Sequence, residues 1–139
     1  MKISANIICK NEEAVIARCI NSFKNIANEI IVVDSGSTDN TISLLKPYFS
    51  ERVRLVVHSE NKGITSARNT LLDNARGEWV AFLSSDDELM PEAVETIMQK
   101  SYEFPEVNWF CAHMIDVESG EYACGDDCHG YMPPGVFPS

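Results

Sequence analysis

Hydrophobic and polar positions along the chain follow two alternating patterns. Short, nearly continuous apolar runs, typical of strands in a parallel sheet, are each followed by a segment whose apolar residues recur at helical spacing. The apolar runs cover residues 3–9, 29–34, 53–58 and 79–83. The helical segments are predicted at about 12–23, 42–45, 64–75 and 91–102. This alternation predicts an α/β fold in which helices cover both faces of a mostly parallel sheet.

Local signals mark the ends of several predicted elements. Asn11 is a candidate N-cap for the first helix, and Gly77 is a candidate C-cap for the third. Pro91 suits the first position of the fourth helix. The run at 79–83 is typical of a strand that is buried on both faces.

The pattern changes beyond Pro105. Residues 107–117 are predicted to form a fifth strand, and residues 121–124 a return strand after a turn. Residues 125–139 are rich in glycine and proline, which predicts a mobile tail or a severed connection. We therefore expect one domain over residues 1–124, followed by a Gly/Pro-rich tail or truncated connection over residues 125–139.

Composition limits the partners and the compartment. The formal net charge is −10 at pH 7, which disfavours binding to nucleic acid or to anionic membrane surfaces. No apolar run is long enough to cross a bilayer, and strand-like sequence begins at Ile3, so we expect neither a transmembrane segment nor a signal peptide. These features predict a cytoplasmic protein, and the inner face of the membrane is the alternative location.

The chain has five cysteines. Cys9 and Cys19 fall in a predicted strand and on a predicted helix face, where a free thiol behaves as a small apolar side chain. Cys124, Cys128 and His129 resemble a metal knuckle, but their spacing is not that of a standard zinc site. Reduced thiols are favoured over zinc or a disulfide, and the role of these three residues stays open.

Polar residues with candidate chemistry follow three of the predicted strands. Asn11 and Glu12 follow the first, Asp34 and Ser35 the second, and the Ser-Ser-Asp-Asp-Glu sequence of residues 84–88 the fourth. The C-terminal ends of parallel strands share one edge, where open α/β sheets bind ligands. Adjacent carboxylates repel one another, which favours a divalent cation at this edge. A solvated acidic turn is the alternative interpretation of the last group.

Several familiar phosphate-binding arrangements do not fit. A dinucleotide site would need a Gly-x-Gly-x-x-Gly motif where this chain has Lys-Asn-Glu at residues 10–12, and no P-loop occurs. A signalling receiver domain would need a phospho-accepting aspartate after the third strand, where residues 58–60 are His-Ser-Glu. A cation held by carboxylates can take over the electrostatic task of a glycine-rich loop.

Four blocks of sequence carry a family resemblance. The blocks are IICKNEE at 7–13, IVVDSGSTDNT at 31–41, NKG with ARN within 61–69, and GEWVAFLSSDD at 77–87 followed by Pro91. In their order and spacing they resemble glycosyltransferase family 2, whose members have the GT-A (Rossmann-like) fold. The resemblance covers roughly residues 3–95 and implies the N-terminal, nucleotide-sugar-binding part of such an enzyme, truncated on the acceptor side.

The resemblance implies roles for the polar residues at the sheet edge. The nucleotide sugar would be bound by Cys9, Asn11, Glu12, Asp34, Ser35, Arg68, Ser84 and Ser85. Asp34 would accept a hydrogen bond from the base, expected to be uracil, and Arg68 would reach the base or the diphosphate. Asp86 would coordinate Mn²⁺ or Mg²⁺ between the diphosphate oxygens, where charge develops as the sugar–phosphate bond breaks.

The implied reaction transfers a sugar from a nucleotide-sugar donor, expected to be a UDP-sugar, to a glycan, lipid-linked or protein acceptor. Ser84 replaces the leading aspartate of the family's Asp-x-Asp motif and brings no charge. The general base is expected beyond the fifth strand and outside this chain, so no catalytic residue is assigned. A non-catalytic nucleotide-sugar-binding or interaction module is the alternative function, and pairing into a homodimer is a further option.

Structural roles compete with functional ones at several positions. Asp39 is interpreted as a turn or cap residue, and Asn61 and Gly63 as residues that shape a loop. Arg68 is equally consistent with an ion pair to a surface acid. His58 is more typical of a structural histidine than of a metal ligand.

Overall fold

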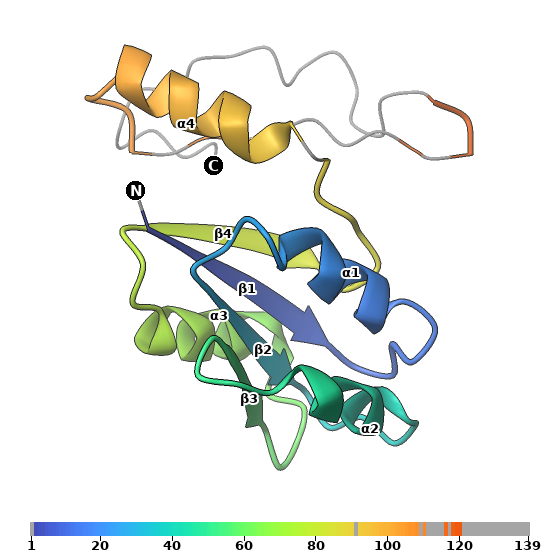
Figure 1. Ribbon diagram of the computed structural model, residues 1–139. Coiled ribbons are helices and arrows are strands. Elements are labelled where there is room, and N and C mark those ends of the chain that lie inside the picture. Colours follow the sequence, from blue (N-terminus) through green and yellow to red (C-terminus); the bar gives the residue numbers. More distant parts are fainter. Residues whose placement is uncertain (1, 91, 109, 111–115, 117, 121–139) are drawn as a thin grey trace. The chain divides into compact units, whose positions relative to one another are not determined.

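The computed structural model describes residues 2–90, 92–108, 110, 116 and 118–120, in two compact units that divide between Pro91 and Glu92. In the first unit, four parallel strands form one sheet in the order β3-β2-β1-β4 (Figure 1). The strands are β1 (Ile3–Cys9), β2 (Glu29–Asp34), β3 (Val53–Val57) and β4 (Trp79–Ser84). They match the predicted apolar runs to within one residue, and the predicted α/β fold is confirmed.

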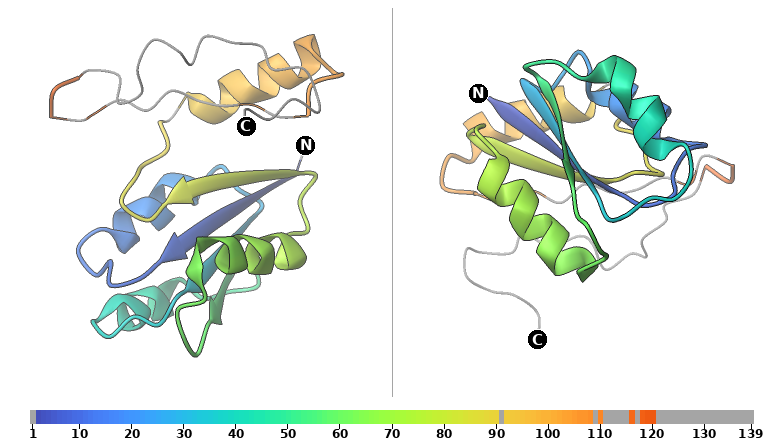
Figure 2. Two further views of the ribbon diagram at one scale, coloured as in Figure 1. Left: turned by 180° about the vertical axis from the view of Figure 1, so that it is seen from behind. Right: turned by 90° about the horizontal axis from the view of Figure 1, so that it is seen from below.

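Helices cover both faces of this sheet, as predicted (Figures 1 and 2). One face carries α1 (Ile16–Phe23), α2 (Thr41–Leu45) and the 3₁₀ turn η1 (Lys46–Tyr48), and the other carries α3 (Gly63–Asn74). The apolar face of α1 packs on alternate residues of β1, which are Ala5, Ile7 and Cys9. On the other face, α3 buries Ala67 and Leu71 against Ile31 and Val33 of β2. Because all four strands are parallel, their C-terminal ends meet at one edge.

The strand β4 is less buried than its apolar sequence predicts. The strands β1 and β2 lie in the middle of the sheet, whereas β4 pairs only with β1 among the described residues. Trp79 is half-buried, and Phe82 is 38% exposed. The expectation of burial on both faces is therefore wrong, because an apolar run identifies a strand without revealing whether the strand is central.

The first loop does not begin with the helix cap that we predicted. The helix α1 starts only at Ile16, after Val15, and no side-chain hydrogen bond caps it. Asn11 instead has a left-handed backbone with φ of 57°, a conformation that asparagine tolerates better than most residues. The loop between β1 and α1 is consequently longer than the sequence indicated.

Gly77 is needed for a close approach to β1 and does not cap α3, which ends at Asn74. A Cβ atom on Gly77 would lie 2.6 Å from the backbone nitrogen of Ser4 and 2.9 Å from the carbonyl oxygen of Lys2. The amide of Gly77 also donates a 2.7 Å hydrogen bond to Ser4 Oγ. The absent side chain therefore lets the α3–β4 connection contact the backbone of β1.

The Gly77→Ala variant is expected to lower the free energy of unfolding by about 3 kcal/mol, because the clashing atoms belong largely to backbone in a central strand. Chemical denaturation measures this loss. Gly36→Ala is the matched control: Gly36 has a φ of 87° and no atom within 4 Å of the added Cβ. Its alanine variant should lose only about 1 kcal/mol, from backbone conformation alone. Equal losses in the two variants would contradict the close-contact explanation.

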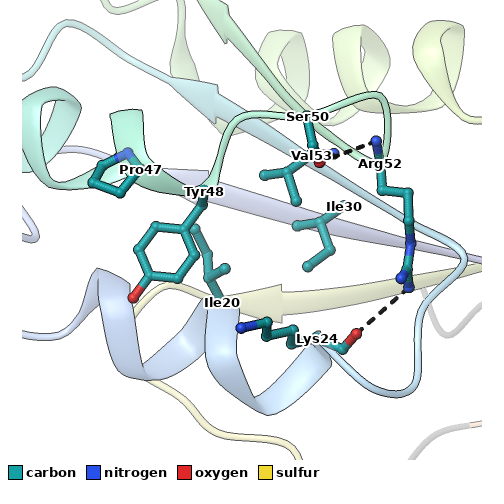
Figure 3. Close-up of a pocket in the computed structure, with 8 residues that line it drawn as sticks. All are labelled: Ile20, Lys24, Ile30, Pro47, Tyr48, Ser50, Arg52 and Val53. Atoms are coloured by element: carbon teal, nitrogen blue, oxygen red, sulfur yellow. Dashed lines mark hydrogen bonds between the residues drawn. The ribbon is translucent and has the colours of Figure 1, made fainter.

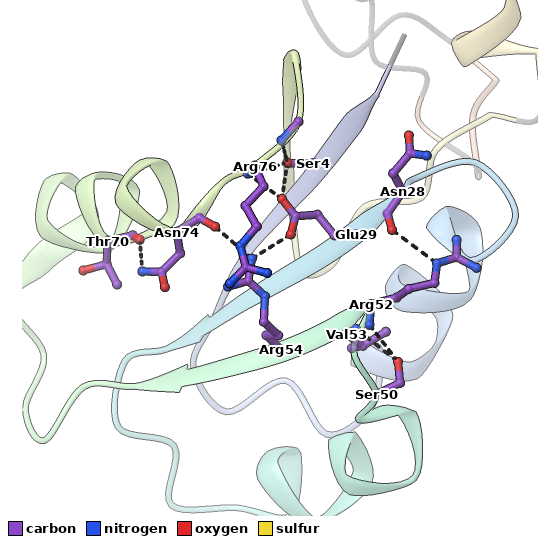
Figure 4. A network of polar contacts seen from close by, with 11 residues as sticks. Ser4, Asn28, Glu29, Ser50, Arg52, Val53, Arg54, Thr70, Asn74 and Arg76 are labelled. Carbon is purple, nitrogen blue, oxygen red and sulfur yellow. Dashed lines mark hydrogen bonds and ion pairs between the residues drawn. The ribbon is translucent and has the colours of Figure 1, made fainter.

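A buried polar network joins the strands at the end opposite their C-termini (Figure 4). Glu29 Oε1 accepts hydrogen bonds from Ser4 Oγ at 2.5 Å and from the Arg76 amide at 2.6 Å. Glu29 Oε2 accepts one from Arg54 Nη2 at 2.6 Å, and Arg54 Nη2 also donates to the carbonyl oxygen of Asn74 at 2.8 Å. Burial alone would raise the pKa of Glu29, but the hydrogen bonds and the Arg54 charge hold it below its usual value. The network connects β1, β2, β3 and the end of α3.

The second unit contains α4 (Ala93–Glu103), close to the predicted helix. Lys100 Nζ lies 2.7 Å from Glu103 Oε2 in its last turn. Of the predicted fifth strand, the described residues 107, 108, 110 and 116 are not in a strand. Several other predictions fall outside the described residues. They concern the rest of that segment, Pro91, the return strand, the boundary at 124/125 with its tail, and the residues Cys124, Cys128 and His129. Within the described part of the chain, no helix combines the length and apolar character that a bilayer crossing requires.

Candidate functional site

The loops that follow β1 and β2 are held together by reciprocal hydrogen bonds. The backbone amide of Asn11 donates to Ser37 Oγ at 2.9 Å, and Asn11 Oδ1 accepts from the backbone amide of Thr38 at 2.8 Å. The left-handed backbone of Asn11 lets its main chain and its side chain both bond to the second loop. Asn11 is thus a link between two loops in this structure.

A second set of contacts extends this link. The Glu12 amide donates to Thr41 Oγ1 at 2.8 Å, and the Glu13 amide donates to Asp39 Oδ2 at 3.2 Å. Asp39 Oδ1 accepts from the amide and the hydroxyl of Thr41, at 3.0 and 2.6 Å, which confirms its predicted turn role. Burial alone would raise the pKa of Asp39, but the hydrogen bonds that it accepts hold the pKa below its usual value. Hydrogen bonds therefore join the two loops along this edge of the sheet.

Asp34 is completely buried at the end of β2. Its Oδ1 accepts from the amides of Gly36 and Ser37 at 3.0 and 2.9 Å, and its Oδ2 accepts from Ser37 Oγ. Cys9 Sγ lies 3.7 Å from the same Oδ2. Burial, followed by the nearby Asp34 carboxylate, raises the pKa of Cys9 far above its usual value, so the thiol stays protonated at neutral pH. Asp34 therefore shapes the second loop, and its carboxylate disfavours the thiolate form of Cys9.

A pocket of about 250 Å³ opens at the C-terminal edge of the sheet. Its walls come from the ends of β1, β2 and β4, from the loop between β3 and α3, and from the start of α3. The residues that line it are Ile8, Cys9, Lys10, Glu12, Ser35, Asn61, Gly63, Ile64 and Ser85. Four segments that are distant in sequence thus converge on one cavity, as expected at this edge of a parallel α/β sheet.

The predicted site residues fall into four groups. Cys9, Glu12, Ser35 and Ser85 line the pocket. Asn11 and Asp34 support its walls, and Ser84 and Asp86 lie in or beside the following turn and are exposed. Arg68 does not line the pocket; its guanidinium carbon lies 6.0 Å from the centre of the Phe82 ring, on the α3 side of β4. This contact is a cation–π interaction, and neither the predicted surface ion pair nor a pocket contact is seen for Arg68 among the described residues.

Five pocket residues do not belong to the site that the sequence predicts: Ile8, Lys10, Asn61, Gly63 and Ile64. Asn61 and Gly63 do shape the loop, since Asn61 Oδ1 accepts from the Gly63 amide at 2.9 Å. The segment Asn61-Lys62-Gly63 belongs to the family-like sequence blocks, and this is the sequence feature that could have placed these residues in the site. Sequence alone did not show that the third loop reaches the same cavity as the first two.

The acidic turn after β4 provides oxygen ligands suited to a hard divalent cation. Asp86 is exposed, and its carboxylate makes no hydrogen bond or ion pair within the described residues. Burial and the neighbouring Asp86 raise the pKa of Asp87. No group of three or more His, Cys, Asp or Glu side chains gathers into a metal site in the part of the chain that the structure describes. The donor set fits a cation of the Mg²⁺ type, which keeps few protein ligands and completes its shell with phosphate oxygens and water.

Another pocket, of about 190 Å³, lies at the opposite end of the strands (Figure 3). Its most prominent charged residue, Arg52, donates to the backbone carbonyl oxygens of Lys24, Ala27 and Asn28, at 3.5, 2.6 and 3.2 Å. Arg52 thereby satisfies carbonyl groups at and beyond the end of α1, which is a structural task. None of the described residues that line this pocket is a carboxylate, so the candidate site is the one at the C-terminal edge.

The chain is similar to known proteins over nearly its whole length. The family model described as glycosyl transferase family 2 matches residues 4–132. Glycosyltransferase GlyA of Streptococcus pneumoniae is 36% identical over 135 residues, which are 93% of this chain and 18% of that protein. Glycosyltransferase SunS of Bacillus subtilis is 38% identical over 61% of this chain and 20% of its own length. The chain therefore spans about a fifth of the length of these relatives.

A solved structure agrees with the sequence comparison. The 1–349 fragment of Staphylococcus aureus TarS in complex with UDP matches 81% of this chain and 38% of its own, with a TM-score of 0.68 and 26% identity. The same fragment without UDP matches equally well, with a TM-score of 0.68. The parallel sheet with helices on both faces is thus a fold of the GT-A type. On the evidence of the matched family model, the chain belongs to glycosyltransferase family 2.

Proposed function

We propose that this chain forms the donor-binding part of a glycosyltransferase that transfers a sugar from a UDP-sugar to a glycan, lipid-linked or protein acceptor. One observation carries the proposal: four segments converge on a pocket beside a turn whose exposed Asp86 carboxylate has no hydrogen bond or ion pair among the residues that the structure describes. The UDP bound to the similar TarS fragment supports uridine as the nucleoside.

The pocket residues have chemistry suited to a nucleoside diphosphate. Ser35 and Ser85 offer hydroxyl groups, Glu12 offers a carboxylate for ribose hydroxyls, and Cys9 offers a small uncharged surface. Asn11 holds the first two walls together. Asp34 is completely buried and both of its carboxylate oxygens already accept hydrogen bonds, so it would shape the wall that carries Ser35 and would not contact the base. Ser84 would interact with the diphosphate side of the donor, whereas Arg68 lies over the Phe82 ring outside the pocket and would not.

The proposed cofactor is Mn²⁺ or Mg²⁺, held by Asp86. Such a cation would stabilise negative charge on the diphosphate as the sugar–phosphate bond breaks. The protein's own contribution is to hold Asp86 in the turn beside the pocket wall formed by Ser85, so that one carboxylate meets the diphosphate end of the donor. Because Ser84 brings no charge, Asp86 is the principal protein anion in this proposal.

Calorimetric titration of UDP into the full chain, with and without Mn²⁺, tests the proposal. We expect binding that is markedly stronger with Mn²⁺, and weaker binding of GDP, CDP and dTDP. Absence of binding by all four nucleotides to a folded chain would overturn the donor-site proposal. A second assay measures whether UDP is released from a bound UDP-sugar by hydrolysis in the absence of an acceptor. Binding without any release of UDP would favour the non-catalytic alternative for this chain.

A further inference from the structure

The acidic turn after β4 is held from α1 by two consecutive helix residues. Arg18 Nη2 donates to the backbone carbonyl oxygen of Asp86 at 3.1 Å, and Arg18 Nε lies 2.9 Å from Glu88 Oε1. Cys19 Sγ lies 3.5 Å from the carbonyl oxygen of Ser84. The turn is therefore contacted near its beginning, middle and end by one turn of α1.

The rest of the turn's surroundings reinforce this arrangement. The amide of Asp87 donates to the carbonyl oxygen of Ser84 at 3.2 Å, which closes the turn internally. Leu89 packs against the apolar cluster that includes the buried face of α1. The turn is therefore anchored at its start by Ser84 and at its end by Leu89. Arg18 attaches the exposed part between them, which contains Asp86, to α1.

The guanidinium group suits this task better than an ammonium group. Its nitrogens have a fixed geometry and contact a carbonyl oxygen and a carboxylate at once, whereas a lysine offers a single charged nitrogen. Arg18 and Glu88 side chains are 56% and 45% exposed, so their ion pair contributes little to folding stability. The contacts of Arg18 instead restrict the backbone on both sides of Asp87, and the guanidinium charge offsets three adjacent negative charges.

We propose that Arg18 is a positioning residue for the donor site: through the Asp86 carbonyl and the Glu88 carboxylate it fixes the turn, and so determines the affinity of the site for the divalent cation and UDP. This inference rests on the proposed function for its binding readout. It does not require Arg18 to touch the ligand, since its contacts are to the turn itself.

The test compares Arg18→Ala and Arg18→Lys in the full chain. We expect both to weaken Mn²⁺-dependent UDP binding by about tenfold, as is typical when the support of a metal ligand is removed. Mn²⁺ affinity, measured by electron paramagnetic resonance of the free ion, should fall with it, while the denaturation midpoint stays near that of the wild type. Lys24→Ala, an exposed lysine directly after the same helix, is the matched control and should change none of these values.

Charge alone would act differently from positioning. If Arg18 only contributed a positive charge, Arg18→Lys would bind like the wild type, and Arg18→Ala would bind Mn²⁺ more tightly because a repelling charge is gone. Either result would overturn the proposal. Glu88→Gln provides a second variant that keeps the side-chain shape and should weaken binding in the same direction but less strongly.

Hydrogen exchange separates this inference from the proposed function. The amides of residues 85–88 should exchange faster in Arg18→Ala and Arg18→Lys than in the wild type, whether or not UDP binds. If the wild type fails to bind UDP with Mn²⁺, the proposed function is wrong, and faster exchange in the variants would still show that Arg18 positions the turn. Unchanged exchange in both variants would refute the positioning role.

Discussion

Replacing Asp86 with asparagine is expected to weaken Mn²⁺-dependent binding of UDP by about 100-fold, or about 2.7 kcal/mol. The substitution keeps the size of the side chain but removes the anionic oxygen that a hard cation prefers. Asp86 is exposed and its carboxylate has no polar contact within the described residues, so the change should leave the fold intact. Calorimetric titration of UDP at saturating Mn²⁺ measures the effect, and thermal denaturation confirms folding.

Asp87→Asn is the matched control for this prediction. It removes the same charge from the adjacent position, but Asp87 is half-buried and its pKa is raised by burial and by Asp86. We expect its effect on UDP binding to be less than about threefold, which corresponds to a general loss of negative potential near the cation. Equal losses in the two variants would show that net charge, and not a specific ligand at position 86, attracts the cation.

Replacing Glu29 with alanine is expected to lower the free energy of unfolding by about 3 kcal/mol, a loss as large as that expected for Gly77→Ala. Glu29 is only 9% exposed, and its removal would leave the Arg54 guanidinium without a carboxylate partner and the Arg76 amide without its shorter hydrogen bond. Breaking a buried pair from one side is costly because the remaining charge is no longer compensated. Urea denaturation at neutral pH measures the loss.

Glu29→Gln should be less damaging. Its free energy of unfolding should fall by only about 1 to 2 kcal/mol, because the amide oxygen can still accept one hydrogen bond. A glutamine variant that is as unstable as the alanine variant would indicate that the charge, and not the hydrogen-bond geometry, dominates the network. An alanine variant as stable as the wild type would contradict the role of Glu29 altogether.

The same network makes stability depend on pH in a defined direction. The pKa of Glu29 is lower in the folded chain than its usual value, so the folded state binds this proton less readily than the unfolded state. Its contribution is therefore complete above the unfolded pKa and is lost as the pH falls through the folded pKa. The stability difference between wild type and Glu29→Gln should shrink on acidification below about pH 4. A difference that stays constant down to pH 2 would contradict the lowered pKa.

The sheet and its helices were accessible from sequence because they follow from local patterns. Four runs of apolar residues, with β-branched residues throughout residues 30–33, predicted four strands within one residue of their observed bounds. Helical spacing of apolar residues predicted α1, α3 and α4. The order of strand and helix then required a parallel sheet, which in turn brought the polar residues after each strand to one edge.

The sequence also indicated the family, because its motif blocks follow the strand ends. It could not indicate how the loops between those ends pack. The sequence pattern starts α1 too early, because an asparagine before two glutamates is typical of a helix cap, whereas in the structure Asn11 bonds to the second loop. The helix-capping propensity of a residue gives no information about a hydrogen-bond partner that lies 26 or 27 residues away in the chain.

What the sequence by itself determined is the set of elements, their parallel arrangement and the edge where chemistry belongs, since each depends on hydrophobic periodicity and chain order. Only the tertiary structure decided which residues meet. It placed Asn61 in the pocket and Arg68 against Phe82, made Gly77 necessary through its contact with Ser4, and attached the acidic turn to Arg18. These are contacts between segments distant in the chain, set by side-chain reach and backbone geometry, and no pattern within either segment alone encodes them.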